Sequence, residues 1–418
     1  MITGSFPLGA AVTLPELAED PHPLLARLRA EEPVSWLPAL GGWLVTRRDL
    51  ATAVMRDAQT YTVDDPRFST AQVVGPSMLS LDGPEHAVHR EPFTAPFRLR
   101  ELHTGFAERI QQQADLLLDG LSRDGAAELR RSFAGPLAAV VMTDILGLVG
   151  ADTTTVLTWY DGIVQAVNEI TEGRPAGPEG ATAYAELRAA VAATVHADGD
   201  RPGDERSGGD RSGDDRPGGD RPGDDRSGGD RSLLVSAAER LGLPELASNA
   251  AVLLFGGIET TEAMIANALL HLLEDPRRVA LVRADDALLD NAVEESLRLE
   301  PGAAVVDRYA TRDVRLGTAE IRRGDLVTVS LAGANRDPAV FAEPDAFDVH
   351  RANSRLQLAF AHGPHYCLGA HLARLETRIA LRTLLDRLPG LRLDPQRPSA
   401  PRGLVFRKPP TLHALWTV

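Results

Sequence analysis

The stretch from residue 245 to 274 limits the possible folds of this sequence more than any other part. Its apolar residues recur at intervals of three and four, which predicts one continuous helix. At 1.5 Å per residue, that helix is about 45 Å long. A helix of this length, in a chain with further helical patterns, predicts a mostly α-helical fold.

The same periodicity predicts more helices, at 107–122, 133–149, 153–171, 181–197, 233–241, 286–299 and 369–388. Short strand-like segments lie at 41–47, 304–310, 326–332, 403–407 and 412–418. With 43% hydrophobic and 25% charged residues, the 418-residue chain can build a large core. We therefore expect a mainly α fold with small β-sheets.

One segment differs sharply from the rest of the chain. Residues 203–232 form six pentapeptides of the kind GGDRS and contain no apolar side chain. Such a segment has nothing to bury that could offset the entropy lost on ordering. Calcium-binding repeats are also rich in Gly and Asp, but they need apolar residues that are absent here. We expect a disordered, low-complexity insertion at 199–232 and no domain boundary.

The composition argues against nucleic-acid and membrane partners. A net charge of −15 leaves no basic stripe for a phosphate backbone. The best candidate for a membrane span is 133–151, but Pro136, Thr143 and Asp144 interrupt it, so we interpret it as a buried helix. The N-terminus has no secretory pattern and a single cysteine cannot form an intramolecular disulfide, so we expect a cytoplasmic protein.

Cys367 is the only cysteine, and it directly precedes a predicted helix. The helix dipole favours a thiolate there, which predicts a lowered pKa for Cys367. Three interpretations are open: a buried structural cysteine, a zinc site, or a haem ligand. The zinc ligands would be His362, His365, Cys367 and His371, but their spacing fits no common zinc motif.

The segment FAHGPHYCLG resembles the haem-binding loop of the cytochrome P450 family, Phe-x-x-Gly-x-His-x-Cys-x-Gly. The matching positions hold Phe360, Gly363, His365, Cys367 and Gly369. The resemblance implies that Cys367 is the axial ligand of a haem b iron and that His365 pairs with a haem propionate. Gly363 would let the loop turn under the porphyrin, and Phe360 would shield the sulfur from water. Ala361 departs from the family, in which glycine is commoner at that position.

The long helix carries LLFGGIETTEAM, which resembles the distal helix of the same family. Gly256 and Gly257 would leave space for dioxygen. Glu259 and Thr260 would supply an acid and a hydroxyl for proton delivery. Judged from the residues alone, an ordinary helix with two glycines and a polar patch explains this segment equally well.

Other motifs occur in the order found in the family. Glu295 and Arg298 match its Glu-x-x-Arg pair, which Arg351 would close into a buried triad, although the pair alone also fits a surface ion pair. The positions that contact haem propionates in the family hold His86, Arg90 and Arg308. The resemblance covers essentially the whole chain, so it implies a single P450 domain over 1–418, with the 199–232 insertion between helices G and H.

The resemblance implies a monomeric haem-thiolate monooxygenase that activates dioxygen and oxidises a hydrophobic or aromatic small molecule. Hydroxylation, epoxidation, oxidative coupling and nitration are open, and secondary metabolism fits the composition. No dinucleotide or flavin fingerprint occurs, so electrons from NAD(P)H would arrive through an external ferredoxin and reductase. A peroxide-driven enzyme and a gas-binding haem protein are the alternatives; both fit less well with an acid and an alcohol on the distal helix.

Two surfaces are expected to bind the partners. The ferredoxin would dock on a basic patch of Arg98, Arg100, Arg374 and Arg378. The substrate pocket would be lined by Val73, Val74, Leu253, Gly256, Gly257, Ala303, Val305, Val306, Val405 and Phe406.

Overall fold

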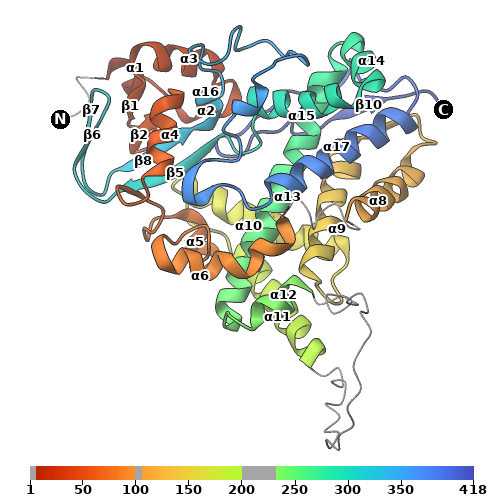
Figure 1. Cartoon of the computed structure of the whole chain (residues 1–418), viewed down its shortest axis with the longest axis horizontal. Coiled ribbons are helices and arrows are strands. Elements are labelled where there is room, and N and C mark those ends of the chain that lie inside the picture. Colours follow the sequence, from red (N-terminus) through yellow and green to blue (C-terminus); the bar gives the residue numbers. More distant parts are fainter. Residues whose placement is uncertain (1–5, 99–105, 200–231) are drawn as a thin grey trace, which may run out of the picture.

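The computed structural model describes residues 6–98, 106–199 and 232–418. The long helix predicted at 245–274 is present as α13 (Leu243–Leu273), which runs through the middle of the molecule (Figure 1). It is the one helix of the described residues that is long and apolar enough to cross a membrane, but 83% of its apolar window is buried inside the protein. Packing against other helices therefore accounts for its composition.

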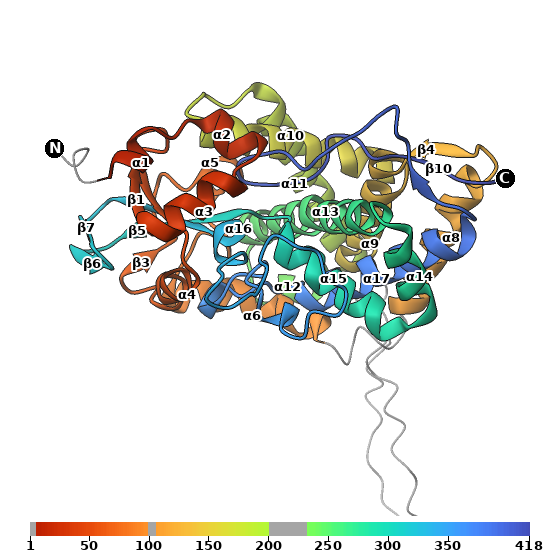
Figure 2. The same cartoon turned by 90° about the horizontal axis from the view of Figure 1, so that it is seen from above.

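Several helices pack directly on α13, and Figure 2 shows it enclosed between them. They are η2 (Arg130–Ala134, a π-helical turn), α9 (Gly135–Leu146), α10 (Thr153–Thr171), α11 (Pro178–Gly199), α12 (Leu233–Ala238), α14 (Pro276–Ala284), α15 (Asp286–Leu299) and α17 (Ala370–Arg387). Their apolar side chains form one large core cluster with those of α13. The segment predicted as a buried helix at 133–151 lies in this cluster, mainly as α9.

The other helices of the described residues are distributed along the chain, and α5 among them also contacts α13. They are α1 (Pro7–Ala10), α2 (Leu14–Glu19), α3 (His22–Glu31), α4 (Arg48–Arg56), α5 (Ser69–Val74), α6 (Gly83–Thr94), η1 (Ala95–Phe97), α8 (Phe106–Leu121), α16 (Leu331–Ala334), η3 (Ser354–Leu356) and η4 (Gly363–His365). With the small sheets described next, they confirm the predicted fold class.

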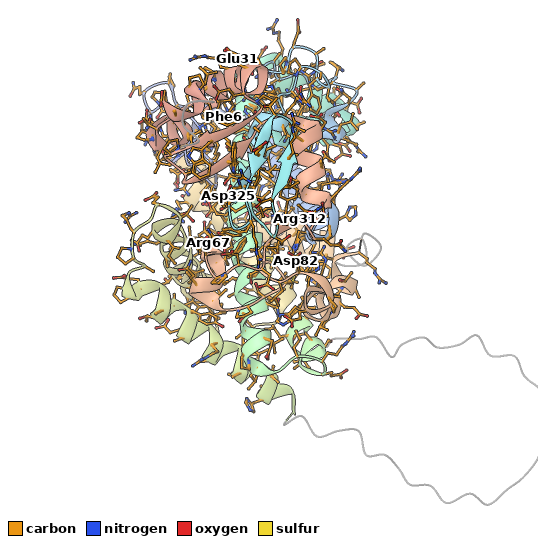
Figure 3. The ribbon with its side chains drawn as sticks, turned by 90° about the vertical axis from the view of Figure 1, so that its left-hand side faces the viewer. Phe6, Glu31, Arg67, Asp82, Arg312 and Asp325 are labelled. Atoms are coloured by element: carbon orange, nitrogen blue, oxygen red, sulfur yellow. The ribbon has the colours of Figure 1, made fainter. Side chains whose placement is uncertain are left out.

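A five-stranded sheet forms a separate lobe beside the helices, with strand order β1-β2-β8-β5-β3. Its strands are β1 (Val34–Leu37), β2 (Gly42–Val45), β3 (Tyr61–Thr62), β5 (Val305–Ala310) and β8 (Leu326–Ser330). Only β2 and β8 pair in parallel. Figure 3 looks at this end of the molecule, with Phe6, Asp325 and Arg67 labelled. Strands β2, β5 and β8 confirm three of the predicted strand segments.

Two smaller sheets complete the fold. One has the order β4-β10-β9, from β4 (Ala126–Glu128), β9 (Arg392–Leu393) and β10 (His413–Leu415); the other pairs β6 (Val314–Leu316) with β7 (Ala319–Ile321). The prediction of a strand at 403–407 was wrong. Gly403 has a φ of +120°, which turns the chain, and this segment makes only isolated bridges, at Phe406 with Ala303 and at Lys408 with Arg402.

The predicted low-complexity insertion, 199–232, falls almost entirely outside the described residues. Helix α11 ends at Gly199, and α12 begins at Leu233 and packs against α11. The prediction that this segment is a disordered insertion within one domain therefore stays a prediction.

Candidate haem site

The cysteine loop is held in shape by its own backbone. The Cys367 amide donates to the carbonyl oxygen of Phe360 at 2.9 Å. Gly363 has a φ of +77°, and a Cβ on it would lie 2.4 Å from the carbonyl oxygen of Met55. Only glycine fits there. Ala361, the departure from the family pattern, also has a positive φ of 58°; that conformation explains why glycine is the commoner residue at its position.

The surroundings of the Cys367 sulfur are apolar on one side and cationic on the other. Phe360 is buried, and the Arg374 guanidinium lies over its ring at 4.3 Å. Burial raises the pKa of the Cys367 thiol, against the Gly369 amide and the charges of Arg90 and Arg374. The predicted lowering of this pKa was therefore wrong. Loss of hydration on burial disfavours the thiolate more than the helix N-terminus favours it.

The predicted propionate ligands gather near the loop. His365 Nε2 lies 2.8 Å from Asp82 Oδ1, and the rings of His365 and His86 are 4.4 Å apart. Burial, helped by the charges of His365 and Arg90, lowers the pKa of His86 to about 4. His86 Nε2 is buried and has no hydrogen-bond partner among the described residues. This nitrogen is free to bond to a group that enters the site.

Two arginines lie in the same region. Arg90 Nη2 donates to the carbonyl oxygen of Tyr366, the residue before the cysteine, at 2.5 Å. Arg308 on β5 is almost fully buried; burial lowers its pKa, which the nearby charge of Asp82 opposes. The structure thus brings the four predicted propionate contacts, His86, Arg90, Arg308 and His365, to the region of the cysteine loop.

The two glycines of the distal helix differ in their surroundings. A Cβ on Gly256 would meet no atom within 4 Å, and the same is true of Gly369 beside Cys367. A Cβ on Gly257 would lie 2.3 Å from the Sδ of Met142 in α9. The prediction that Gly257 leaves space for dioxygen was therefore wrong: this glycine allows α9 to pack closely on α13, and only Gly256 borders open space.

The predicted proton-delivery pair does not form one continuous chain. Thr260 Oγ1 donates to the carbonyl oxygen of Gly256 at 2.6 Å. Glu259 is buried and takes its partners from elsewhere: its Oε2 accepts from Tyr160, and its Oε1 lies 2.9 Å from Lys408 Nζ. Among the described hydrogen bonds, none joins the two side chains. Lys408 is the only lysine of the chain, and its place beside Glu259 was not predicted.

The three residues of the predicted triad meet in the protein interior. Arg298 Nε lies 2.7 Å and Arg351 Nε 2.9 Å from carboxylate oxygens of Glu295, and Glu295 and Arg298 are fully buried. Arg298 also donates to the carbonyl oxygens of Pro344 and Ala346. A buried network replaces the surface ion pair that the spacing alone allowed.

One cavity lies beside the five-stranded sheet, and a second lies at Glu259 of the distal helix. The larger, about 460 Å³, includes Val305 and Val405 in its lining. The smaller, about 330 Å³, includes Val405 and Phe406. The other predicted pocket residues border neither cavity: Val73, Val74, Leu253, Gly256, Gly257, Ala303 and Val306. Val74 and Leu253 are instead buried in the large core cluster.

The zinc interpretation of the cysteine loop, which the ligand spacing already disfavoured, gains no support from the structure. No group of three His, Cys, Asp or Glu side chains is placed to hold a metal ion within 6–98, 106–199 and 232–418. His362 accepts a hydrogen bond from Arg56 Nε at 2.7 Å.

The predicted basic docking patch is also weaker than expected. Arg98 is exposed, and Arg100 lies outside the described residues. Arg374 pairs with Glu294, and Arg378 lies 3.7 Å from Asp290. Half of the predicted cations are therefore partly neutralised by carboxylates of α15.

These features fit haem b. There is open space at Gly256 on the distal helix, and there is also open space at Gly369, two residues after Cys367. The sulfur of Cys367 is a suitable axial donor to iron. The unpartnered His86 Nε2 and its cationic neighbours suit carboxylate groups such as the haem propionates.

Comparison with known proteins gives consistent results. The family model for cytochrome P450 matches residues 223–414. The chain is 35% identical to the cytochrome P450 monooxygenase PikC of Streptomyces venezuelae, over 96% of this chain and 90% of PikC. It is 34% identical to nocardicin C N-oxygenase of Nocardia uniformis, over 99% of each chain. Among solved structures, P450BioI in complex with an acyl carrier protein that carries hexadec-9Z-enoic acid has a TM-score of 0.82 and 28% identity, covering 96% of this chain and 100% of that one.

Proposed function

The chain belongs to the cytochrome P450 family, as a monooxygenase with a haem cofactor, and from that premise we propose that it uses dioxygen and electrons from a separate ferredoxin to oxidise an apolar small molecule. The observation that carries this proposal is the position of the only cysteine, on a rigid loop beside a cluster of cationic side chains, in a chain with the distal acid and alcohol also present.

The haem would be held by this chain's own residues at both its centre and its edge. Cys367 would supply the axial thiolate, and His86, Arg90, Arg308 and His365 would bond to the propionates. Phe360, Gly363 and Gly369 would shape the loop beneath it. When bound, the haem supplies the oxygen-binding and oxidising chemistry of the family.

The protein's part in the reaction is to hold the substrate, exclude water and deliver protons. We assign the proton delivery to Glu259 and Thr260 on α13. The presence of both an acid and an alcohol favours the use of dioxygen over a peroxide-driven reaction, which does not need protons from the protein. Thr260 lies one turn after Gly256 on the same face of α13, and its hydroxyl donates to that residue's carbonyl oxygen.

Apolar side chains dominate the walls of the larger cavity and support an apolar substrate. They include Leu17, Leu25, Leu44, Val305 and Val405. We propose hydroxylation, epoxidation or oxidative coupling, in secondary metabolism, by a monomeric cytoplasmic enzyme. NAD(P)H would supply the electrons through a reductase and the ferredoxin.

A reconstituted reaction tests the proposal. Small apolar and aromatic molecules are first screened for a spectral shift of the haem-loaded protein, and the best binder is incubated with NADPH, a surrogate ferredoxin and its reductase under ¹⁸O₂. We expect a product that carries ¹⁸O and depends on the ferredoxin. Product formation with hydrogen peroxide, but none with the electron-transfer proteins, would instead favour the peroxide-driven alternative.

A further inference from the structure

The only lysine of the chain lies against the predicted catalytic acid. We infer that Lys408 is a positioning residue that holds the Glu259 carboxylate at the smaller cavity, and that this cavity is the route by which solvent protons reach Glu259. The inference rests on the proposed monooxygenase function, in which Glu259 delivers protons.

Both carboxylate oxygens of Glu259 are already occupied. One lies 2.9 Å from Lys408 Nζ, and the other accepts a hydrogen bond from Tyr160 in α10. Lys408 Nζ also donates to the Tyr160 hydroxyl at 3.1 Å. Glu259 and Tyr160 are buried, and only 14% of the Lys408 side chain is exposed. The three groups therefore form a closed triangle that fixes the direction of the carboxylate.

A second acid shares the same cation. Glu262, fully buried and three residues further along α13, contacts Lys408 Nζ and also accepts from Arg130 Nη1 at 3.2 Å. An ammonium has three N–H donors. Lys408 Nζ donates to Glu262 and to the Tyr160 hydroxyl, and it forms an ion pair with Glu259. Arginine presents a planar fork in place of this tripod. The site thus uses the one basic residue of 44 that has the required shape.

The balance of charge around Glu259 depends on Lys408. Arg130 and Arg131 lie on the side of Glu262, with Arg131 4.0 Å from it. Burial, and then the charges of Glu259 and Glu262, raise the pKa of Tyr160 far above its usual range, so this phenol stays neutral. Without Lys408, Glu259 would keep only a neutral partner and would lie one turn from a second buried carboxylate. Its neutral, protonated form would then be favoured.

The smaller cavity connects this cluster to solvent. Buried Tyr160 and Glu259 line it together with Asp161 and Arg402, whose side chains are 55% and 61% exposed. Its volume of about 330 Å³ has room for several waters, and polar groups of Arg130, Asn168 and Arg402 stand in its lining beside apolar side chains. In each cycle the Glu259 carboxylate takes up a proton delivered by cavity water and passes it on toward the Thr260 side, which restores the carboxylate.

The first test needs no turnover. In the haem-loaded Lys408→Met variant at neutral pH, infrared spectroscopy should show a new carboxylic-acid C=O band that Glu259→Gln removes. The wild type should show no band that Glu259→Gln removes; Glu376, whose pKa burial raises to about 8, gives a carboxylic-acid band in the wild type and the variants alike. Lys408→Arg, which keeps the charge, should not show the Glu259 band either. No new band, or one removed only by Glu262→Gln, overturns the inference. Lys408→Gln provides a second neutral variant where the methionine variant does not fold.

The second test follows the reaction. Lys408→Met should lower kcat about tenfold and raise the solvent deuterium isotope effect. The loss is smaller than the 10²–10⁴-fold that the proton-transferring side chain itself contributes, because Lys408 acts only through Glu259. The KM for substrate should stay within about twofold, since binding is not affected. Arg397→Met removes a cation of the same C-terminal segment, 2.7 Å from Asp394, and should change none of these values.

The outcomes separate this inference from the proposed function. If the wild type makes no oxygenated product, the proposed function fails, and the infrared test still reports on Lys408 and Glu259. If the wild type is active and Lys408→Met matches it in kcat and isotope effect, Lys408 has no positioning role.

Discussion

Gly363 sets the shape of the cysteine loop at the scale of a single residue. Its φ is positive, and a side chain there would collide with the backbone of α4 at Met55. A backbone atom cannot move aside as a flexible side chain can. The loop also contains Ala361 in a positive-φ conformation, which is uncommon for a residue with a Cβ.

We predict that Gly363→Ala lowers both stability and haem content. Strain at the positive φ and the contact with Met55 should cost at least about 2 kcal/mol. Thermal unfolding and the ratio of haem to protein after purification measure the two effects. Gly120→Ala in α8 is the matched control, because a Cβ there meets no atom within 4 Å; it should be neutral or slightly stabilising. Wild-type haem content in Gly363→Ala would contradict this account of the loop.

Site residues that are close in sequence could be predicted, and those brought together by the fold could not. Cys367, Gly363 and His365 lie within one short motif. Tyr160 contacts Glu259 across 99 residues, and Lys408 contacts Glu262 across 146. Spacing carries no signal over such distances. The one available hint for Lys408 was that it is the only lysine in a chain whose other 43 Lys and Arg residues are arginines.

At the scale of elements, helix α15 is attached to the segment before the cysteine loop by the buried triad. Glu295 accepts from Arg298 in its own helix and from Arg351, 56 residues later. Two arginines share one carboxylate, and carbonyl oxygens satisfy their remaining donors. A buried network of this kind is strongly destabilised when one member is lost, because the remaining charges stay unpaired.

We predict that Glu295→Ala lowers the free energy of unfolding by about 3–5 kcal/mol. Far-UV circular dichroism of the haem-loaded protein during heating provides the measurement. The control is Arg378→Ala, since Arg378 and Asp290 are both more than 40% exposed and 3.7 Å apart; its loss should cost less than about 1 kcal/mol. Equal effects of the two variants would show that the triad is no more important than a surface pair.

Element boundaries were predictable where local chemistry marks them. Helices α10 and α15 have the predicted bounds, and each begins after an aspartate whose side chain caps the helix, Asp152 and Asp285. The short helices before residue 100 were not predicted, because three to twelve residues give too few turns for a clear period. The segment 403–407 has a strand-like composition, but Gly403 turns it away from a sheet.

At the scale of the whole molecule, an ionic cluster joins three distant parts of the chain. Glu300 after α15 pairs with His22 at the start of α3, with Arg407 in the C-terminal segment and with Arg336. Burial acts against the Glu300 carboxylate, but the hydrogen bond and charge of His22 and the charges of both arginines outweigh it and lower its pKa to about 2. Burial lowers the pKa of His271 to about 4.

These shifts predict loss of stability in acid. The pKa of His271 is below its usual 6.5, so the unfolded chain takes up a proton first and stability falls as the pH drops from about 6.5 to 4. The pKa of Glu300 is below its usual 4.5, so its contribution, about 3 kcal/mol, is lost as the pH drops from about 4.5 to 2. Below pH 4.5, the denaturation midpoint of Glu300→Gln should depend less on pH than that of the wild type. Parallel curves for variant and wild type would contradict the assignment.

The mainly α architecture with small sheets was predictable because long amphipathic helices dominate the chain. The positions of the cavities were not, since they depend on how the sheet lobe, α10 and the C-terminal segment meet. For the same reason, most of the predicted pocket residues border neither cavity.

The central claim is that Cys367 ligates a haem iron. It is tested most directly by the carbon monoxide difference spectrum of the reduced, haem-loaded protein. We predict the Soret band characteristic of thiolate-ligated haem in the wild type and its loss in Cys367→Ser, with the far-UV circular dichroism of the fold retained. Absence of that band from the wild type, or its persistence in Cys367→Ser, would contradict the account.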